Sequence, residues 1–216
     1  MVLRLARQLE VPLRERNELL VAAGYAPVFK ATPLEDPALD GARKVIDLLL
    51  RGHEPYPALA VDRHWTMISA NRTVSLLVAG IDPSLLEPPV NVLRLSLHPA
   101  GLASRIANLA EWRSHLFARL RRQIDVSADP VLVELLKELS SYPVRSENNK
   151  SETSETDFAG VAVPFQLTTE AGVLSFLSTT TVFGTPIDIT LSELAMESFF
   201  PADVPTFDAL NKLFER

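Results

Sequence analysis

The feature that most constrains the fold of this sequence is a compact hairpin pattern in its first third. An apolar run at 58–61 is followed by a polar turn at 62–64 and by alternating side chains at 65–69. Two strand-forming runs around such a turn predict a tight antiparallel hairpin. Asn71 is a good helix N-cap, and the apolar stripe after it ends at Gly80, which predicts a short helix. A two-stranded hairpin is not stable alone, so the rest of the chain must supply further strands and a helical cover.

Three more strands are predicted near the C-terminus. Side chains alternate at 161–167, where Pro164 indicates an edge position or a bulge, and a long Thr-rich run follows at 173–183. Further on, 190–193 is a possible capping box, whereas 194–200 alternates as a strand does. We favour the strand at 194–200 because it completes a five-stranded sheet.

Helices are predicted between and after these strands. Caps, proline positions and apolar spacing predict helices at 36–51, 91–97 and 101–123, and others that begin at 129 and 203. A segment rich in Ser, Glu and Asn at 143–157 predicts a mobile surface loop. Strands, then helices, then strands is an α+β order. We therefore predict a PAS-like five-stranded antiparallel sheet covered by helices, with the early hairpin beside the last strand.

Composition narrows the class of protein. The chain has 216 residues, of which 47% are hydrophobic and 22% charged, as is typical of a globular protein with a substantial core. The formal net charge of −6 argues against general polyanion binding by the whole chain. The sequence has no cysteine, no signal peptide and no apolar run approaching the ~18 residues of a membrane span. These features predict a soluble, cytoplasmic protein without membrane association.

The sequence lacks the common motifs for catalysis and metal binding. Its four histidines, His53, His64, His98 and His115, do not have metal-ligand spacing. It contains neither a Gly-x-Ser-x-Gly nucleophile elbow nor a Gly-rich phosphate loop. We therefore predict no catalytic residue, no metal site and no cofactor, and we expect that the protein is not an enzyme.

The N-terminal 26 residues predict two short helices, with Pro12 in the first turn of the second helix and Gly24 at its end. From this pattern alone the segment is a two-helix hairpin. Three of its pieces resemble the last two helices of an XRE-type helix-turn-helix domain: Leu5–Leu9, Val11–Arg16 and Leu19–Pro27. The resemblance implies that 1–27 is an incomplete helix-turn-helix domain whose DNA-reading helix lies upstream of this chain.

A second resemblance extends through the rest of the chain. The segments that carry it are His53–Pro57, Asp62–Trp65, Asn91–Pro99, Asn108–Arg113, Ser175–Pro186 and Glu197–Asp203. Together they resemble the ligand-binding domain of MmyB-like transcription regulators, bacterial proteins that join an XRE-type helix-turn-helix to a PAS-like C-terminal domain. The resemblance implies a linker and connecting helix at 28–52 and a PAS-like ligand-binding domain at 53–216.

The same resemblance implies a sensor of a small hydrophobic, fatty-acid-like molecule. A carboxylate-headed lipid needs an apolar tunnel with a cation or hydrogen-bond donor at its mouth. The polar candidates among apolar neighbours are Arg94, His98, Arg105 and Asn108. Arg105 is the first choice because a guanidinium can hold a carboxylate with two bonds. Each of these residues, taken singly, also fits a solvent-facing or backbone-capping role.

The candidates for the pocket wall are large apolar side chains, namely Trp65, Trp112, Phe117, Phe176 and Met196. Such side chains pack well around apolar ligands, but they fill ordinary protein cores equally well.

Three functions remain open from the sequence. The first is a ligand-sensing and dimerising domain of a transcription regulator, in which a hydrophobic ligand modulates DNA binding. The second is a homodimerisation module without a physiological ligand. The third is a hydrolase of small acyl substrates, for which the sequence offers no motif.

Overall fold

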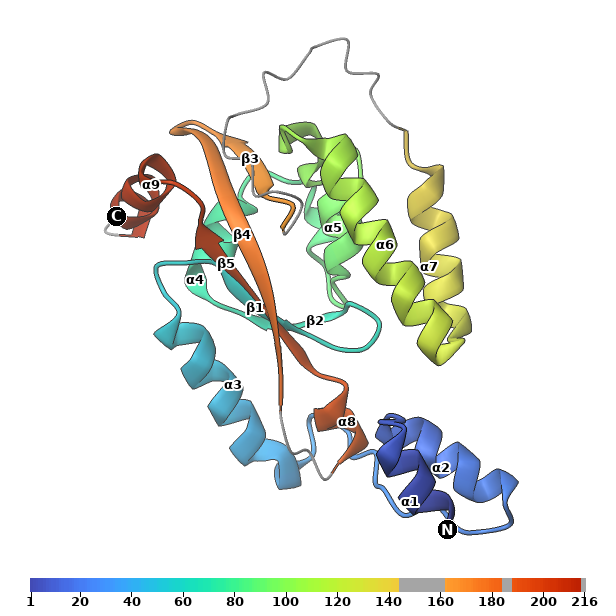
Figure 1. Cartoon of the computed structure of the whole chain (residues 1–216). Helices are drawn as coiled ribbons and strands as arrows, with labels where there is room; N and C mark the ends of the chain where they lie inside the picture. The colour runs from blue at the N-terminus through green and yellow to red at the C-terminus, as the bar shows by residue number, and fades with distance from the viewer. Residues whose placement is uncertain (144–161, 184–187, 215–216) are drawn as a thin grey trace.

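The computed structural model describes residues 1–143, 162–183 and 188–214. Its centre is a five-stranded antiparallel sheet in the order β2-β1-β5-β4-β3 (Figure 1). The strands are β1 Ala58–Val61, β2 Met67–Ala70, β3 Phe165–Thr169, β4 Gly172–Val182 and β5 Ala195–Pro201. The predicted α+β class is confirmed, and so is the position of the early hairpin beside the last strand, because β1 pairs with both β2 and β5. The arrangement is consistent with a PAS-like fold.

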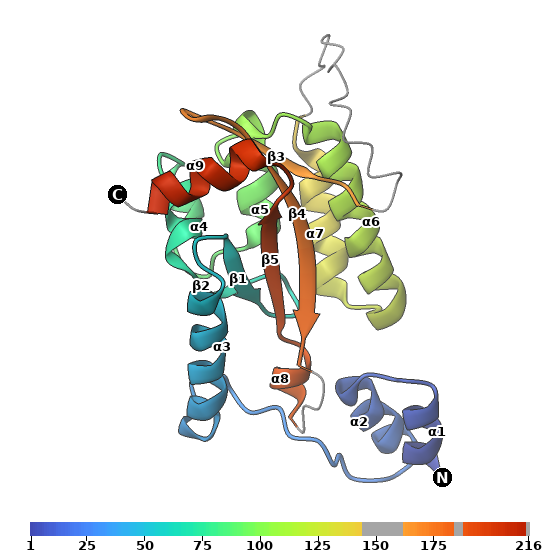
Figure 2. The same cartoon turned by 60° about the vertical axis from the view of Figure 1, so that its left-hand side comes forward.

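Helices cover both faces of the sheet (Figures 1 and 2). One face is covered by α4 Arg72–Leu77, α5 Val92–Leu97 and α6 Leu109–Ser127, and α7 Pro130–Ser141 packs outside α5 and α6. The opposite face is covered by α3 Asp40–Gly52. Near the C-terminus, α9 Val204–Phe214 packs against β4 and β5. Short 3-10 turns occur at Pro37–Leu39, Pro83–Leu85 and Leu102–Arg105.

Side chains of β1 alternate between these two faces. Leu59 and Val61 belong to the large core cluster beneath α4, α5, α6 and α7. Ala58 and Ala60 belong to a smaller cluster, in which they contact α3 through Ile46. The alternation of strand side chains thus divides the core into two parts.

The turn of the hairpin explains why its second strand begins later than predicted. Asp62 Oδ1 accepts hydrogen bonds from the backbone N–H groups of His64 and Thr66, both at 2.8 Å. Trp65 has a φ of 65°, in the left-handed region, so it belongs to the turn and not to the strand. The prediction of a strand at 65–69 is therefore wrong at its start, and β2 begins at Met67.

The N-caps predicted from the sequence are present. The Asn71 side chain accepts from the backbone N–H of Val74 and begins α4, and the Asn91 side chain begins α5 in the same way. Asp129 accepts from Val131 N at 2.9 Å and begins α7. These caps satisfy backbone donors that a helix leaves unpaired at its first turn.

The predicted helix at 101–123 is wrong in its first part. Residues Leu102–Arg105 form a 3-10 turn, and α6 begins only at Leu109. Between them Ile106 forms a β-bridge with Leu167, and Ala107 N donates to Gln166 O at 2.9 Å. This contact with the edge strand β3 holds the backbone extended, which apolar spacing along the sequence cannot reveal.

The capping box considered at 190–193 is not formed as predicted, because Thr190 lies inside a helix whose N-cap is Asp188. A short helix, α8 Ile189–Ser192, is capped by Asp188 and precedes β5, so the preferred strand is confirmed. The edge position predicted for Pro164 is also confirmed, since β3 is the last strand of the sheet. The start of the strand predicted at 161–167 and nearly all of the loop predicted at 143–157 lie outside the described residues.

The N-terminal segment forms two helices, α1 Val2–Gln8 and α2 Leu13–Ala22, of which α1 packs on α2 and α2 contacts α8 (Figure 1). Arg14 of α2 donates from Nε and Nη2 to the two carboxylate oxygens of Glu193, at 2.6 and 2.8 Å. Behind α2, Lys30 forms a parallel bridge with Asp188. A bidentate ion pair and a backbone bridge therefore fix these helices beside the end of the sheet.

Candidate ligand-binding site

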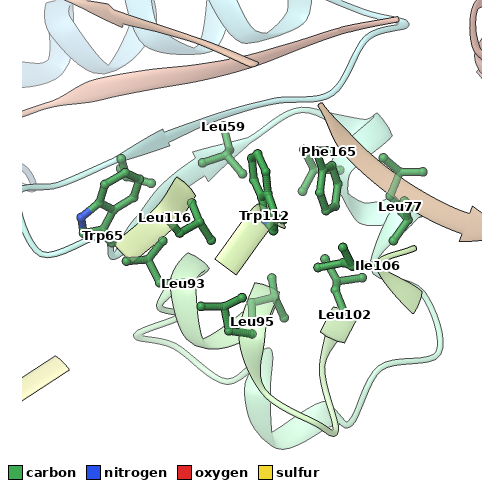
Figure 3. Packing of buried hydrophobic residues seen from close by; sticks show 14 of the residues in the cluster. Leu59, Trp65, Leu77, Leu93, Leu95, Leu102, Ile106, Trp112, Leu116 and Phe165 are labelled. Atoms are coloured by element: carbon green, nitrogen blue, oxygen red, sulfur yellow. The ribbon is translucent and has the colours of Figure 1, made fainter. Parts of the chain in front are cut away.

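An apolar cavity of about 100 Å³ lies between the sheet and the helices of its larger face. Figure 3 shows the surrounding apolar side chains, which come from β1, β3, α4, α5 and α6. The wall includes Leu59, Leu77, Leu93, Leu95, Trp112, Leu116, Phe165, Phe176 and Phe199. Such a space excludes strongly polar ligands and accepts apolar ones.

An aromatic cluster forms one wall of this cavity. The rings of Trp112 and Phe165 lie 5.0 Å apart between centroids, and Phe165 stacks on Phe176 at 6.0 Å. Trp112 Nε1 donates to Ser96 Oγ at 3.0 Å, which satisfies the polar atom of the indole. His115 stacks on the same indole, and burial, with the nearby Arg119 as the second cause, lowers the pKa of its imidazole.

The polar end of the cavity is an ion pair between α6 and β5. Arg119 donates to Glu197 Oε1 at 2.7 Å and to Oε2 at 3.1 Å, while Thr180 Oγ1 donates to Glu197 Oε1 at 2.8 Å. Glu197 is only 4% exposed. Bidentate geometry and the extra hydrogen bond offset the cost of removing both charges from water.

Trp65 lies beside this ion pair. The Arg119 guanidinium lies 4.8 Å from the centroid of the Trp65 ring, in cation–π geometry. Trp65 Nε1 donates to Gln123 Oε1 at 2.9 Å, and Gln123 Nε2 donates to Arg63 O at 2.6 Å. The indole is therefore fixed from both α6 and the hairpin turn.

A second space, whose lining includes several charged side chains, begins on the other side of Trp65 and Arg119. This groove has a volume of about 460 Å³ and lies against α2, which contributes Glu15 to its wall. Arg63 and Glu193 line it as well, and they form an ion pair at 3.2 Å. Trp65 and Arg119 line both spaces, so their side chains form the partition between them.

Arg105 and Asn108 lie outside the lining of the cavity and bind backbone. Arg105 donates to the carbonyl oxygens of Leu77 at 3.0 Å and Thr168 at 3.4 Å. Asn108 donates to Pro164 O at 2.8 Å and accepts from Gln166 N at 3.2 Å. Both side chains fasten the segment before α6 to its neighbours.

Arg94 and His98 lie nearer the surface. Arg94 forms a bidentate pair with Glu138, at 2.8 and 2.7 Å, and this pair lowers the pKa of Glu138. His98 packs edge-on against Tyr142, with ring centroids 5.0 Å apart. Burial and a hydrogen bond to Glu138 raise the pKa of Tyr142 to about 12. The structure thus brings Arg94 and His98 into one surface network around α7.

The apolar candidates divide into three groups. Trp65, Trp112 and Phe176 line the cavity. Phe117 lies on α6 beside Arg113, whose guanidinium is 5.0 Å from its ring, and it does not line the cavity. Met196 packs on the opposite face of the sheet, because side chains alternate along β5 and its neighbour Glu197 faces the cavity.

The polar pair that the structure places at the cavity, Arg119 with Glu197, is absent from the candidates predicted from the sequence. One signal was available for Glu197, a lone charge in an alternating strand beside Met and Phe residues. Arg119 carried no such signal, because it lies beside the apolar stripe of α6 and three further arginines occur on the same helix.

The described parts of the chain contain no group of three His, Cys, Asp or Glu side chains arranged to hold a metal ion. In the same residues, every helix is too short or too polar to cross a bilayer.

Comparison with known proteins identifies the family of this chain. The model of the family described as MmyB-like transcription regulator ligand binding domain matches residues 42–213, from within α3 to the last turn of α9. The curated protein sequences give no match. Because the family match covers the sheet, its helices and the cavity, the chain belongs to the family of MmyB-like transcription regulator ligand-binding domains.

Proposed function

We infer that this domain binds a single-chain amphiphile such as a fatty acid and that binding modulates DNA recognition by the regulator. The observation that carries the proposal is the apolar cavity with its aromatic wall of Trp112, Phe165 and Phe176. Ligand sites in small domains are commonly enclosed, mostly apolar spaces with a few polar groups at one end. The Arg119–Glu197 pair supplies such groups here.

The size of the cavity restricts the part of a ligand that it can enclose. A cavity of about 150 Å³ holds a benzene-sized guest in another protein. A space of about 100 Å³ therefore encloses a short apolar segment and not a complete long-chain lipid. A longer chain must displace side chains or extend out of the cavity, which favours medium-chain acids as the first ligands to test.

Thermal shift and native mass spectrometry over saturated acids from hexanoate to palmitate test this function. We expect a bound acid and a raised melting temperature for at least the medium chains. Leu95→Phe fills the cavity and should remove the shift, whereas Met196→Phe adds comparable bulk on the other sheet face and should keep it. Protein that binds none of these acids would contradict the proposal.

We place DNA recognition in helices that precede α1 in a complete XRE-type domain, with α1 and α2 as its last two helices. Support comes from the sequence resemblance and from the fixed contact of α2 with the sheet domain through Arg14 and Glu193. This contact gives the ligand-binding domain a physical connection to the DNA-binding part.

A homodimer is a second element of the proposal, favoured by one helix face. Val45, Leu48 and Leu49 expose apolar side chains on α3, and Leu48 is 69% exposed. Lys44 and Asp47 flank them with opposite charges, so the face is self-complementary under a twofold axis. Sedimentation analysis should give a dimer that Leu48→Glu converts to a monomer, and a wild-type monomer at high concentration would contradict this element.

A further inference from the structure

The surroundings of the cavity differ at its two ends, near Leu77 and near Trp65. At the first end, Arg105 donates to the carbonyl oxygens of Leu77 and Thr168, which fastens the 3-10 turn to α4 and β3. At the second end, Trp65 and Arg119 separate the cavity from the groove. Figure 3 shows Trp65 at one edge of the apolar cluster and Leu77 at the opposite edge. An elongated guest that outgrows the cavity therefore extends toward the groove.

The groove differs from the cavity in both size and polarity. It encloses about 460 Å³, against about 100 Å³ for the cavity. Its charged lining residues are Glu15, Arg63, Arg119, Arg122 and Glu193. Arg63 and Arg119 already hold carboxylates, whereas Arg122 makes no ion pair with any residue that the structure describes. The groove thus offers a guanidinium for an anionic group close to the end of an apolar space.

We propose that Trp65 and Arg119 form a gate through which an amphiphile binds, with its chain in the cavity and its carboxylate in the groove at Arg122. This inference rests on the proposed function and adds the orientation of the ligand and the residue that selects its head group. The apolar chain is removed from water, while the carboxylate keeps a charged partner and remains partly solvated.

This orientation brings the charged head beside α2. Glu15 of α2 lines the groove, and Glu193 in the same wall holds Arg14 of α2 and Arg63 of the hairpin turn. A carboxylate at Arg122 therefore changes the electrostatic surroundings of the ion pairs that fix α2. Ligand binding therefore changes the stability of the contact between the N-terminal helices and the sheet domain through this network of ion pairs.

The two tryptophans of the chain allow the orientation to be measured directly, because one is in the gate and the other in the cavity wall. Bromine quenches indole fluorescence at short range. Decanoate carrying bromine next to the carboxylate should quench Trp65 in the Trp112→Phe protein. Decanoate carrying bromine at the far end of its chain should quench Trp112 in the Trp65→Phe protein.

The quenching experiment distinguishes failure of the proposed orientation from failure of ligand binding. The reverse pattern, or equal quenching of both indoles by both acids, would overturn the inference while leaving fatty-acid binding in place. If native mass spectrometry detects no decanoate bound to the wild-type protein, the proposed function itself fails and the inference fails with it. Because Phe retains most of the buried ring, each single-tryptophan protein should keep the fold, which circular dichroism checks.

A matched pair of surface variants tests the head-group residue. Arg122→Gln should weaken decanoate binding about tenfold, the effect of losing one charged hydrogen-bond partner, and should leave binding of uncharged decanol unchanged. Arg121→Gln is the control, because Arg121 lies over Phe117 and is not part of the groove lining. Decanoate should also alter hydrogen exchange of α2 amides in wild type and not in Arg122→Gln. Equal affinity of both variants for decanoate would overturn the role of Arg122.

Discussion

The two faces of the sheet are built from the same strands and pack in different ways. On the α3 face, β1 presents Ala58 and Ala60, whose small side chains allow the helix to approach the strand closely. On the other face, β1 presents Leu59 and Val61 beneath helices that carry Trp112 and other large side chains. Large side chains that meet from several elements leave a space between them. Small side chains beneath a single helix pack against it without such a space. The cavity therefore follows from which residues alternate onto which face.

The two faces of the sheet also differ in their buried charged groups. The larger face contains a buried ion pair, Arg119 with Glu197, at one end of the cavity. On the α3 face, Ile46 and Leu194 pack in the smaller cluster, and the buried polar side chain on the same side as Met196 is Ser198, which is uncharged. A ligand-binding face needs a specific polar group, whereas a face that only supports a helix does not.

The largest expected effect comes from breaking the ion pair of the larger face. Glu197→Ala leaves the Arg119 guanidinium in place without its partner and should lower the free energy of unfolding by about 3 kcal/mol. The double variant Arg119→Leu with Glu197→Leu should recover stability to within about 1 kcal/mol of wild type. Urea denaturation measures both values. Equal losses in the single and double variants would show that the pair is not a coupled unit.

A pH-dependent effect is expected at Asp129, which joins the hairpin turn to α7 on the same side of the sheet. Burial alone would raise the pKa of Asp129, but hydrogen bonds from His64 and Arg63 outweigh it and lower the pKa from 3.8 to about 2. Because the pKa is lower in the folded state, the carboxylate stabilises the fold above about pH 4, and this contribution is lost as the pH falls toward about 2. The shift corresponds to about 2 kcal/mol.

Comparison with Asp129→Asn measures this contribution, since Asn retains a capping oxygen and loses the charge. The difference in unfolding free energy between the two proteins should be largest near neutral pH and should decrease as the pH falls through about 2. A difference that does not change with pH would contradict the role of the Asp129 charge.

Replacing one side chain on each face by a larger one measures how tightly each face is packed. Ala60→Leu should destabilise the protein by about 2 kcal/mol, because the added atoms meet α3. Leu95→Phe should cost less than about 1 kcal/mol, since the cavity accepts part of the added ring. Thermal unfolding of both variants checks the order. A larger loss in Leu95→Phe than in Ala60→Leu would mean that the cavity side is the more tightly packed.

The smallest expected effect lies away from both faces. Arg94 pairs with Glu138 near the surface, so Arg94→Ala should lower stability by less than about 1 kcal/mol. Decanoate affinity should stay at the wild-type value. A clear loss of affinity would return Arg94 to the set of ligand-binding residues and would weaken the assignment of the head group to the groove.

The parts of the fold that were predicted correctly depend on local chemistry. Asn71, Asn91 and Asp129 begin helices because a side-chain oxygen satisfies backbone N–H groups two or three residues away. Such signals lie within a few residues and are visible in the sequence. The helix predicted at 101–123 failed in its first part because Ile106 pairs with Leu167, a contact between distant segments.

The site was harder to predict because it depends on which side each residue faces. Alternation along β5 shows that Met196 and Glu197 point to opposite faces, but it does not show which face lies under the helices with the cavity. The sequence favours Arg105 and gives no signal for Arg119, yet Arg105 binds backbone carbonyls and Arg119 reaches the cavity. Only the packing of α6 on the sheet distinguishes them.

The central claim is that the apolar space on the larger sheet face binds the chain of an amphiphile. Anomalous diffraction from crystals grown with decanoate brominated at the end of its chain tests it most directly. We expect a bromine peak inside the cavity, beside the rings of Trp112, Phe165 and Phe176. A bromine peak on the α3 side near Met196, or no peak inside the cavity at saturating ligand, would contradict it.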